Sequence, residues 1–328
     1  MLAPSEQFQD GPFSTSQVPA SESFALWSRV LSKWLLNVHG NALGDGRFHA
    51  AVRLRVLPEM RFGWGVVGAS SYSRTRDVTD NDDLFLFMNL GGTFVASGKG
   101  HEIELAPGEG YVMNCSEIGA HASVTDGRVL TLRVPNAAMR PLVRDLNGKT
   151  GNIIRRDHEG LNMLSTYLRS VGETEPLSDQ ATRRLATRHV QELFALALGA
   201  TDDAREAAED GGLPAARLRA AKAIIRRNLS QPKLSAEYIA GCLNISPRSL
   251  QRLFETDGTT FSVFVAGERV AQAHAALSDP RKFGLSVADI ALDCGFGDIS
   301  YFNRRFKSRY GASPSEVRFE ARSLVRRP

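Results

Sequence analysis

Cysteine is scarce in this chain of 328 residues, which contains only Cys115, Cys242 and Cys294. They are odd in number and far apart, and no two form a C-x-x-C motif, so neither a disulfide framework nor a zinc site is expected. Cys242 and Cys294 are most simply explained as small core residues. Long apolar stretches are also missing, because no run of about 18 apolar residues is present to cross a membrane. The N-terminus lacks the basic and apolar segments of a secretory signal, and we therefore expect a cytoplasmic protein with no membrane partner.

The chain has little net charge, +4 at neutral pH, but that charge is unevenly placed. Residues 213–328 contain 19 of the 40 Lys and Arg residues and only 10 of the 36 Asp and Glu residues, a balance of +9. The remaining residues balance at −5. An excess of positive charge in one part of a chain is typical of a surface that meets the phosphates of a nucleic acid. The rest of the composition is ordinary for a globular protein, and the length allows two domains.

The C-terminal third contains an internal repeat, at residues 234–254 and 285–307. Each copy begins with Leu-Ser, continues with Ile-Ala, and after a short break reaches two large apolar residues four positions apart. Capping residues mark the helix ends: Ser286 starts a capping box, Ser246 precedes a proline, and Asp298 can cap the second helix of the second copy. Each copy is therefore predicted to be a helix-turn-helix unit.

The second helix of each copy has one apolar and one polar face. The residues predicted to point outward, or to lie near the exposed N-terminal end, are Arg248, Ser249, Gln251, Arg252, Ile299, Ser300, Tyr301, Arg304 and Lys307. A recognition helix needs this arrangement, because its N-terminal part must reach base edges while its other face packs on the preceding helix. Arg and Gln can each form paired hydrogen bonds to one base edge. A single exposed arginine is an ordinary solvated side chain, but the duplicated unit with matched caps favours binding to double-stranded DNA.

Residues 290–318 carry a resemblance to a known family. They read I-A-x-x-C-G-F-G-D-x-S-Y-F-x-R-x-F-K-x-x-Y-G-x-S-P-S-E-x-R, which is similar to the DNA-binding domain of the AraC/XylS family of bacterial transcription regulators. The resemblance implies that each recognition helix enters one of two successive major-groove segments. By motif position, the reading residues are Arg248, Gln251 and Arg252 in the first helix, and Ile299, Ser300, Tyr301 and Arg304 in the second. Ile299 departs from the polar residues often found there, which favours contact with a thymine methyl or the backbone. The family also implies RNA polymerase as a partner and activation of transcription.

The N-terminal part has a different pattern. Residues 1–20 are rich in Ser, Gln, Pro and Gly and predict a mobile arm. Residues 23–38 have the spacing of an amphipathic helix that packs on the following domain, and packing explains its two tryptophans better than ligand contact does. Nine segments of strand character follow, at residues 48–56, 61–67, 69–76, 83–90, 93–97, 101–105, 110–114, 120–124 and 129–134. Many short strands separated by turns rich in Gly, Asp and Asn are typical of a sandwich or barrel.

Residues 105–114, L-A-P-G-E-G-Y-V-M-N, resemble a turn of the cupin-like sensor domains in AraC-type regulators. The resemblance implies an α+β fold class: a cupin-like β-barrel with flanking helices, followed by an all-α domain of two helix-turn-helix units. Cupin enzymes usually hold a metal through an H-x-H pair, a Glu and a later His. This sequence has no H-x-H motif, and its seven histidines are scattered. We therefore expect no metal, no cofactor and no catalytic residues.

A barrel without a metal can still bind a small-molecule effector in a mostly apolar cavity. The candidate lining residues are Trp64, Phe85, Phe87, Asn89, Tyr111 and His121. For each aromatic residue among them, core packing is the stronger single explanation, and His121 is more simply a satisfied or surface histidine than a ligand. The run L-F-L-F-M-N-L at residues 84–90 is nearly all apolar, so strand alternation does not show which of its side chains point inward.

Three helices are predicted after the strands, a short one at residues 136–146 and longer ones at residues 161–171 and 179–198. Helices at this place often form the dimer in the resembling family, which implies a homodimer. Residues 201–212 are acidic and Ala-rich and end in two glycines, a composition typical of a linker. The expected organisation is a mobile arm (1–20), a cupin-like effector-binding and dimerisation domain (21–200), a linker (201–212) and a DNA-binding domain (213–328).

These patterns predict a sequence-specific DNA-binding transcriptional regulator that responds to a small-molecule effector. An activator is favoured over a repressor by the family resemblance. Two alternatives stay open at this point: a DNA-binding protein that has no effector, and a cupin-type enzyme fused to a DNA-binding domain.

Overall fold

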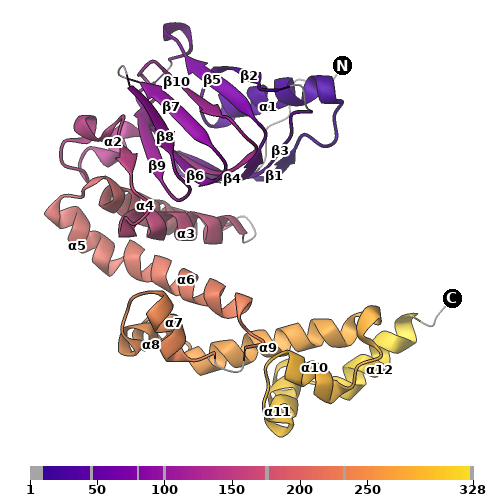
Figure 1. The fold of residues 1–328 in the computed structure, drawn as a ribbon. Helices are drawn as coiled ribbons and strands as arrows, with labels where there is room; N and C mark the ends of the chain where they lie inside the picture. Colours follow the sequence, from indigo (N-terminus) through magenta and orange to yellow (C-terminus); the bar gives the residue numbers. More distant parts are fainter. Residues whose placement is uncertain are drawn as a thin grey trace. The chain divides into compact units, whose positions relative to one another are not determined.

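The chain folds into two compact units, Met1–Ala216 and Arg217–Pro328. The structure, a computed structural model, describes residues 10–44, 47–79, 81–98, 101–173, 177–231 and 234–325. The first unit contains two β-sheets with flanking helices, and the described residues of the second unit form helices and their connections (Figure 1). The predicted α+β fold class is confirmed.

Two antiparallel sheets form the centre of the first unit. The larger has the strand order β1 (Gly11–Ser14), β3 (Ala50–Leu57), β4 (Met60–Val67), β11 (Gly127–Val134), β6 (Leu84–Gly91), β9 (Gly110–Asn114) and β12 (Ile153–Ile154). The smaller has the order β2 (His39–Ala42), β5 (Ser70–Arg74), β10 (Gly119–Ser123), β7 (Phe94–Gly98) and β8 (His101–Leu105). All nine predicted strands are present, each within about two residues of its predicted ends. The short strands β1, β2 and β12 were not predicted.

Strand β6 lies inside the larger sheet, and both of its faces are covered. Leu84, Leu86 and Met88 belong to a core shared with helices, whereas Phe85 and Phe87 pack in the core between the two sheets. A strand covered on both faces reads as a continuous apolar run instead of an alternating one. This explains why alternation could not assign the inward side chains of this segment.

Helices cover the outer face of the larger sheet and the opening between the two sheets (Figure 1). Helix α3 (Glu159–Glu173) packs on α4 (Gln180–Leu198), and both contribute leucines and aromatic residues to the core on the outer face of the sheet. Helix α1 (Ala20–Trp34) contributes Trp27, Val30 and Leu31 to the core between the sheets. The short helix α2 (Asn136–Met139) and the 3-10 turns η1 (Arg76–Val78) and η2 (Leu146–Lys149) complete the connections.

The expectation of a mobile arm over residues 1–20 is wrong for its second half. Gly11–Ser14 form strand β1, which pairs with the edge of β3, and Thr15 is buried with its backbone N–H donating to the carbonyl of Ala50 at 2.9 Å. An unpaired sheet edge offers a row of backbone donors and acceptors, which is sufficient to order a polar segment beside it. The first half of the predicted arm, residues 1–9, lies outside the described residues.

The segment predicted as a linker is largely helical. Helix α5 (Asp202–Asp210) is capped by Thr201, whose hydroxyl accepts from the Ala204 N–H at 3.3 Å. Ala204 and Ala208 are buried, so the alanines that suggested a linker form an apolar stripe. Helix α6 (Gly212–Arg227) starts directly afterwards and continues past the point where the two units divide.

The second unit contains the predicted repeat. Its first copy is α7 (Ala236–Cys242) and α8 (Pro247–Thr256), and its second copy is α10 (Val287–Asp293) and α11 (Ile299–Tyr310). Helix α9 (Phe261–Ser278) joins the copies, followed by the turn η3 (Pro280–Lys282), and α12 (Pro314–Val325) packs against α9. Each copy has its own core: Leu250 and Phe254 are fully buried in the first, Phe302 and Phe306 in the second.

Helix α9 gives side chains to both small cores. Val265 packs in the core of the first copy, whereas Val270 and Leu277 pack in the core of the second. The predicted caps are formed, because Ser286 and Asp289 make a reciprocal capping box and Asp298 accepts from the N–H at the third position of its helix. One continuous helix therefore sets the separation of the two helix-turn-helix units.

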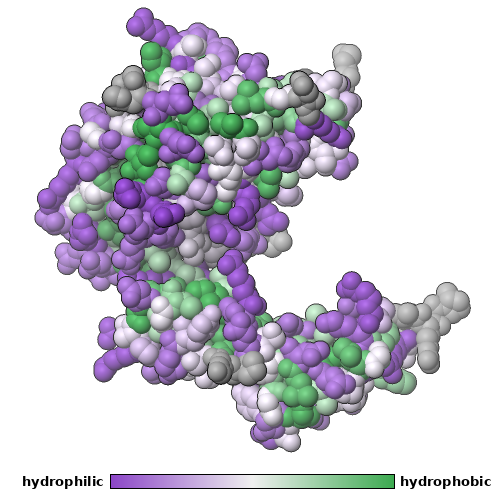
Figure 2. Space-filling view, in the orientation of Figure 1, coloured by the Kyte–Doolittle hydropathy of each residue, from purple (hydrophilic) through white to green (hydrophobic). Residues whose placement is uncertain are grey.

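Among the described residues, the cysteines are free thiols. Cys115 and Cys294 are buried, but Cys242 is exposed at the end of α7, so its prediction as a core residue is wrong. Of the helices that the structure describes, none has the length and apolar character needed to span a lipid bilayer. On the visible surface of each unit, most residues are hydrophilic, and smaller hydrophobic patches are scattered among them (Figure 2).

Candidate functional site

The first candidate site is the exposed face of α8. Ser246 caps this helix by accepting from the Ser249 N–H at 3.1 Å, and Pro247 occupies its first position. The apolar face is buried in the first small core, and the side chains that remain exposed near the N-terminal end are those of Arg248, Ser249, Gln251 and Arg252. Arg248 and Arg252 were predicted to face outward, and Ser249 and Gln251 to lie on the flanks of the helix. Arg248, Gln251 and Arg252 border an open hollow whose other walls come from α7 and the start of α9.

A carboxylate orients one of these side chains. Gln251 Nε2 donates to Glu255 Oε1 at 2.8 Å, one helical turn further along the exposed face. Within the described residues, no ion pair engages Arg248 or Arg252. Their guanidinium groups are therefore available to an external acceptor, such as a phosphate or the O6 and N7 edge of a guanine.

The second candidate site is the matching face of α11. Asp298 caps it by accepting from the Tyr301 N–H at 3.0 Å. Ser300, Tyr301, Arg304 and Lys307 are exposed as predicted. Tyr301 is 38% exposed, and the guanidinium of Arg305 lies 5.9 Å from the centre of its ring. The charged and hydroxyl groups on this face can donate to base edges and phosphates.

Two residues of α11 differ from the prediction. Ile299 is half-buried and packs against the second small core, so only part of its side chain is open to a partner. Asn303, which was not among the predicted residues, is exposed between Ser300 and Lys307. The helical period that placed Phe302 and Phe306 inward also places Asn303 outward, and an amide there suits adenine.

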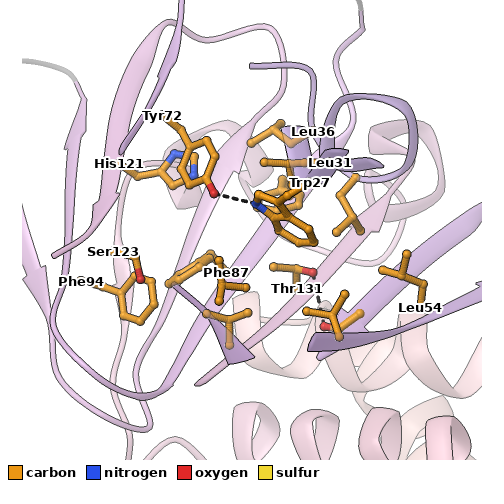
Figure 3. Close-up of a pocket in the computed structure, with 16 residues that line it drawn as sticks. Trp27, Leu31, Leu36, Leu54, Tyr72, Phe87, Phe94, His121, Ser123 and Thr131 are labelled. Carbon is orange, nitrogen blue, oxygen red and sulfur yellow. Dashed lines mark hydrogen bonds between the residues drawn. The ribbon is translucent and has the colours of Figure 1, made fainter. Parts of the chain in front are cut away.

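A cavity in the first unit forms the third candidate site (Figure 3). It lies between the two sheets beneath α1 and leaves about 40 Å³ for the centres of water-sized molecules. Its lining residues are Trp27, Leu31, Leu35, Leu36, Val52, Leu54, Gly63, Val67, Tyr72, Phe85, Phe87, Phe94, His121, Ser123, Val129 and Thr131. The walls are mostly apolar, with a few hydroxyl groups, one indole N–H and one imidazole.

Tyr72 and His121 form a stacked pair at one end of the cavity (Figure 3). Their ring centres are 4.9 Å apart, and Tyr72 Oη accepts from Trp27 Nε1 at 2.7 Å. Burial lowers the pKa of His121 to about 4, and the positive charge of Arg74 acts in the same direction. Burial likewise raises the pKa of Tyr72. Both rings are therefore uncharged at neutral pH, when His121 offers one donor and one acceptor nitrogen.

Family models match both units of the chain. The model described as an AraC-binding-like domain matches residues 27–199, more than half of the chain, and a helix-turn-helix domain model matches residues 239–319. The chain belongs to the AraC family of transcriptional regulators. It is thus a DNA-binding regulator that binds through its helix-turn-helix units and carries a domain of effector-binding type.

Named relatives of this AraC-family chain are regulators of transcription, not enzymes. It is 38% identical over 105 residues to the transcriptional activator RhrA of Rhizobium meliloti (strain 1021), a match that spans 32% of this chain and 33% of RhrA. It is 27% identical over 238 residues to the XylDLEGF operon transcriptional activator of Pseudomonas putida, covering 70% of this chain and 72% of that protein. The crystal structure of the AraC-like transcriptional activator CuxR aligns with 86% of this chain and 99% of its own, at 20% identity and a TM-score of 0.48.

The six residues proposed to line an effector site do not all meet in the cavity of this AraC-family protein. Phe85, Phe87 and His121 line it. Tyr111 lies beyond His121 in a separate small pocket that also contains Arg74. The prediction that Tyr111 shares the main cavity is therefore wrong in detail.

Two further predicted residues point elsewhere. Trp64 stacks on Phe62 on the outer face of the sheet, where it packs against Gly172 of α3, because its position in β4 has the opposite parity to Gly63. Asn89 is fully buried and uses its amide locally: it donates to the carbonyls of Gly92 and Leu105 and accepts from the N–H of Gly91. Neither side chain lines the cavity, and both predictions are corrected.

Sequence reasoning missed the contribution of α1. Trp27 and Leu31 of this helix, with Leu35 and Leu36 just after it, close one side of the cavity. Their 3–4 spacing was recognised, but it was assigned to packing alone. The same spacing serves both core packing and cavity lining. An amphipathic helix that packs over the opening between two sheets also forms one wall of the space beneath it.

Proposed function

We propose that this regulator binds duplex DNA by placing α8 and α11 in two successive major-groove segments. The observation that carries the proposal is the division of each helix into a fully buried apolar face and an exposed polar face near the capped N-terminal end. That division is what a recognition helix requires. The excess of basic residues in residues 213–328 supplies the general attraction to phosphates.

The base-reading residues that we propose are Arg248, Gln251 and Arg252 in α8, and Ser300, Tyr301, Asn303 and Arg304 in α11. Ser249 and Lys307 are assigned to the phosphate backbone, and the open part of Ile299 to a thymine methyl or the backbone. Helix α9 has 18 residues and is about 27 Å long. Because its two ends belong to the two small cores, this length supports recognition sites about one helical turn of DNA apart.

We infer that the cavity between the sheets is the effector site, within a domain that spans residues 21–200. An effector shifts a regulator between two arrangements only if it binds them with different affinities. Helix α1 forms one wall of the cavity, so occupancy that moves this helix satisfies that condition. Helices α3 and α4 pack on the same sheet from its other face.

We also propose self-association and activation of transcription. Leu185 is 49% exposed on α4 and is flanked by Arg184 and Arg188, which supports self-association through this helix and hence a homodimer. RhrA and the XylDLEGF operon protein are named transcriptional activators, which supports activation here, with RNA polymerase as the partner in the bacterial cytoplasm.

The test is in vitro selection of random DNA duplexes by the full-length protein at physiological salt. We expect two short elements about 10 base pairs apart. Recovery of no motif, with binding that falls steeply as salt rises, would mean contact with phosphates only. Repeating the selected-site binding with candidate metabolites then separates an effector-responsive regulator from one that needs no effector.

A further inference from the structure

The lining of the cavity restricts the charge of any molecule that enters it. Among its sixteen lining residues there is no Lys, Arg, Asp or Glu. Arg74, whose positive charge acts on His121, lies outside this lining and donates to the backbone carbonyls of Asn37, Cys115 and Glu117. A carboxylate or ammonium group in this cavity would lose its hydration without meeting an opposite charge, which is strongly unfavourable.

The cavity nevertheless offers one polar anchor. Among the described residues, neither ring nitrogen of His121 has a hydrogen-bond partner, whereas the other polar groups of the lining do: Trp27 bonds Tyr72, Thr131 bonds the carbonyl of Gly63 at 3.3 Å, and Ser123 bonds the carbonyl of Thr125 at 3.2 Å. A neutral imidazole can donate to a carbonyl or hydroxyl oxygen and can accept from a hydroxyl. The aromatic rings around it provide flat apolar surfaces.

Size gives a second restriction. A cavity of about 150 Å³ in another protein holds benzene, whereas this one leaves about 40 Å³. A single-ring molecule must therefore enlarge the cavity. The strands on either side are held by ladders of hydrogen bonds to their neighbours. Helix α1 docks through apolar side chains and through the bond from Trp27 to Tyr72. At its C-terminal end it is also held by Arg61, which donates to the carbonyls of Lys33 and Trp34. Within the described residues it has no ladder of backbone hydrogen bonds to the sheets, so it is the wall that yields most easily.

We propose that the cavity takes a small, uncharged, mainly apolar molecule of single-ring size that carries one hydroxyl or carbonyl group bound by His121, and that its entry displaces α1. This inference rests on the proposed function in that the cavity is taken as the effector site. It adds the chemical class of the effector and the element that moves.

The experiment compares three probes of similar size with the full-length protein at pH 7: benzyl alcohol, which is neutral, benzoate, an anion, and benzylamine, a cation. At low-millimolar concentration, benzyl alcohol is expected to raise the Tm by about 3 °C in a saturable manner and to change the tryptophan fluorescence through Trp27. Benzoate and benzylamine are expected to leave the Tm unchanged. An equal rise with either ion, or no rise with any probe, overturns the proposal.

A matched pair of variants locates the binding. Val129→Leu reduces the cavity by one methylene, and Val112→Leu makes the same change on the other face of the larger sheet, away from the cavity. The Tm shift caused by benzyl alcohol should fall in Val129→Leu and persist in Val112→Leu. An equal fall in both variants would place the probe elsewhere and overturn the assignment.

The two proposals fail separately. DNA selection is carried out without any probe, so its failure removes the DNA-reading assignment and leaves the ligand class standing. If benzyl alcohol binds in the cavity but leaves binding to the selected duplex unchanged, the ligand class is supported and the effector role is rejected.

Discussion

Trp27 Nε1 donates to Tyr72 Oη at 2.7 Å, and this bond joins α1 to strand β5 of the smaller sheet. Both side chains are buried, at 4% and 6% exposure. The bond lies in the wall of the cavity, next to the ring of His121. One of the contacts that attach the helix to the sheets therefore lies where an occupant of the cavity would disturb it.

Removing this bond should weaken the first unit. In Trp27→Phe the buried hydroxyl of Tyr72 loses its indole donor, which costs about 1–2 kcal/mol beyond the loss of ring volume. Trp34→Phe is the matched control, because Trp34 is equally buried on α1 and its indole makes no hydrogen bond among the described residues. Urea unfolding at pH 7 measures the difference. Equal losses in the two variants would show that the bond contributes nothing to the attachment of α1.

The depressed pKa of His121 predicts how stability changes with pH. Because its pKa is about 4 in the folded protein and 6.5 in the unfolded chain, the unfolded state binds more protons between these values. This contribution is complete above pH 6.5 and is lost as the pH falls to about 4, with an upper limit of about 3 kcal/mol. His121→Phe should flatten the decline of Tm over that window. His39→Phe, a change at an exposed histidine, is the control and should leave the decline due to His121 in place.

The second unit was predictable from the sequence because its signals are local. Caps, helical period and duplication all lie within one short segment, and each describes a contact between near neighbours in the chain. Exposure of Arg248, Arg252 and Arg304 followed from the same helical period that buries Leu250 and Phe302. Asn303 obeys that period too, and it was omitted only because the family motif leaves its position open.

The cavity was less predictable because its walls come from segments far apart in the chain. Strand positions were found, but their parity depends on which face is covered by helices, and that is a tertiary property. In β6, Phe85 and Phe87 point into the cavity while Leu86 points to the helices, although all three have the same apolar character. Trp64 was misplaced for this reason.

The true environment of Trp64 leads to a prediction about α3. A Cβ atom added at Gly172 would lie 1.9 Å from Trp64 Cη2, so Gly172→Ala requires the indole to move. The overpacking should cost about 1–3 kcal/mol of unfolding free energy. Gly241→Ala is the control, since nothing lies within 4 Å of its added Cβ and alanine favours the helix. Thermal unfolding should show a fall in Tm for the first variant and none for the second; the same fall in both would reject the packing argument.

The last prediction concerns the two recognition helices. Arg252→Ala and Arg304→Ala remove corresponding guanidinium groups from α8 and α11, so each should relax specificity at one position of a different element in the selected DNA. The expected cost is about 1–3 kcal/mol in binding to the selected duplex. Lys307→Ala is the contrasting variant, because a phosphate contact should weaken binding to all sequences alike and reduce the salt slope by about 1.

Repeating the selection with each variant distinguishes these roles. If Arg252→Ala alters one element and Arg304→Ala alters the other, the two helices read separate segments, and the distance between the altered positions measures the separation imposed by α9. If both arginine variants instead lose affinity equally for every sequence, they contact phosphates, and base reading passes to Gln251 and Asn303. Loss at the same element in both variants would contradict the placement of the helices in successive grooves, since side chains attached to the two small cores at opposite ends of α9 would then have to reach one site.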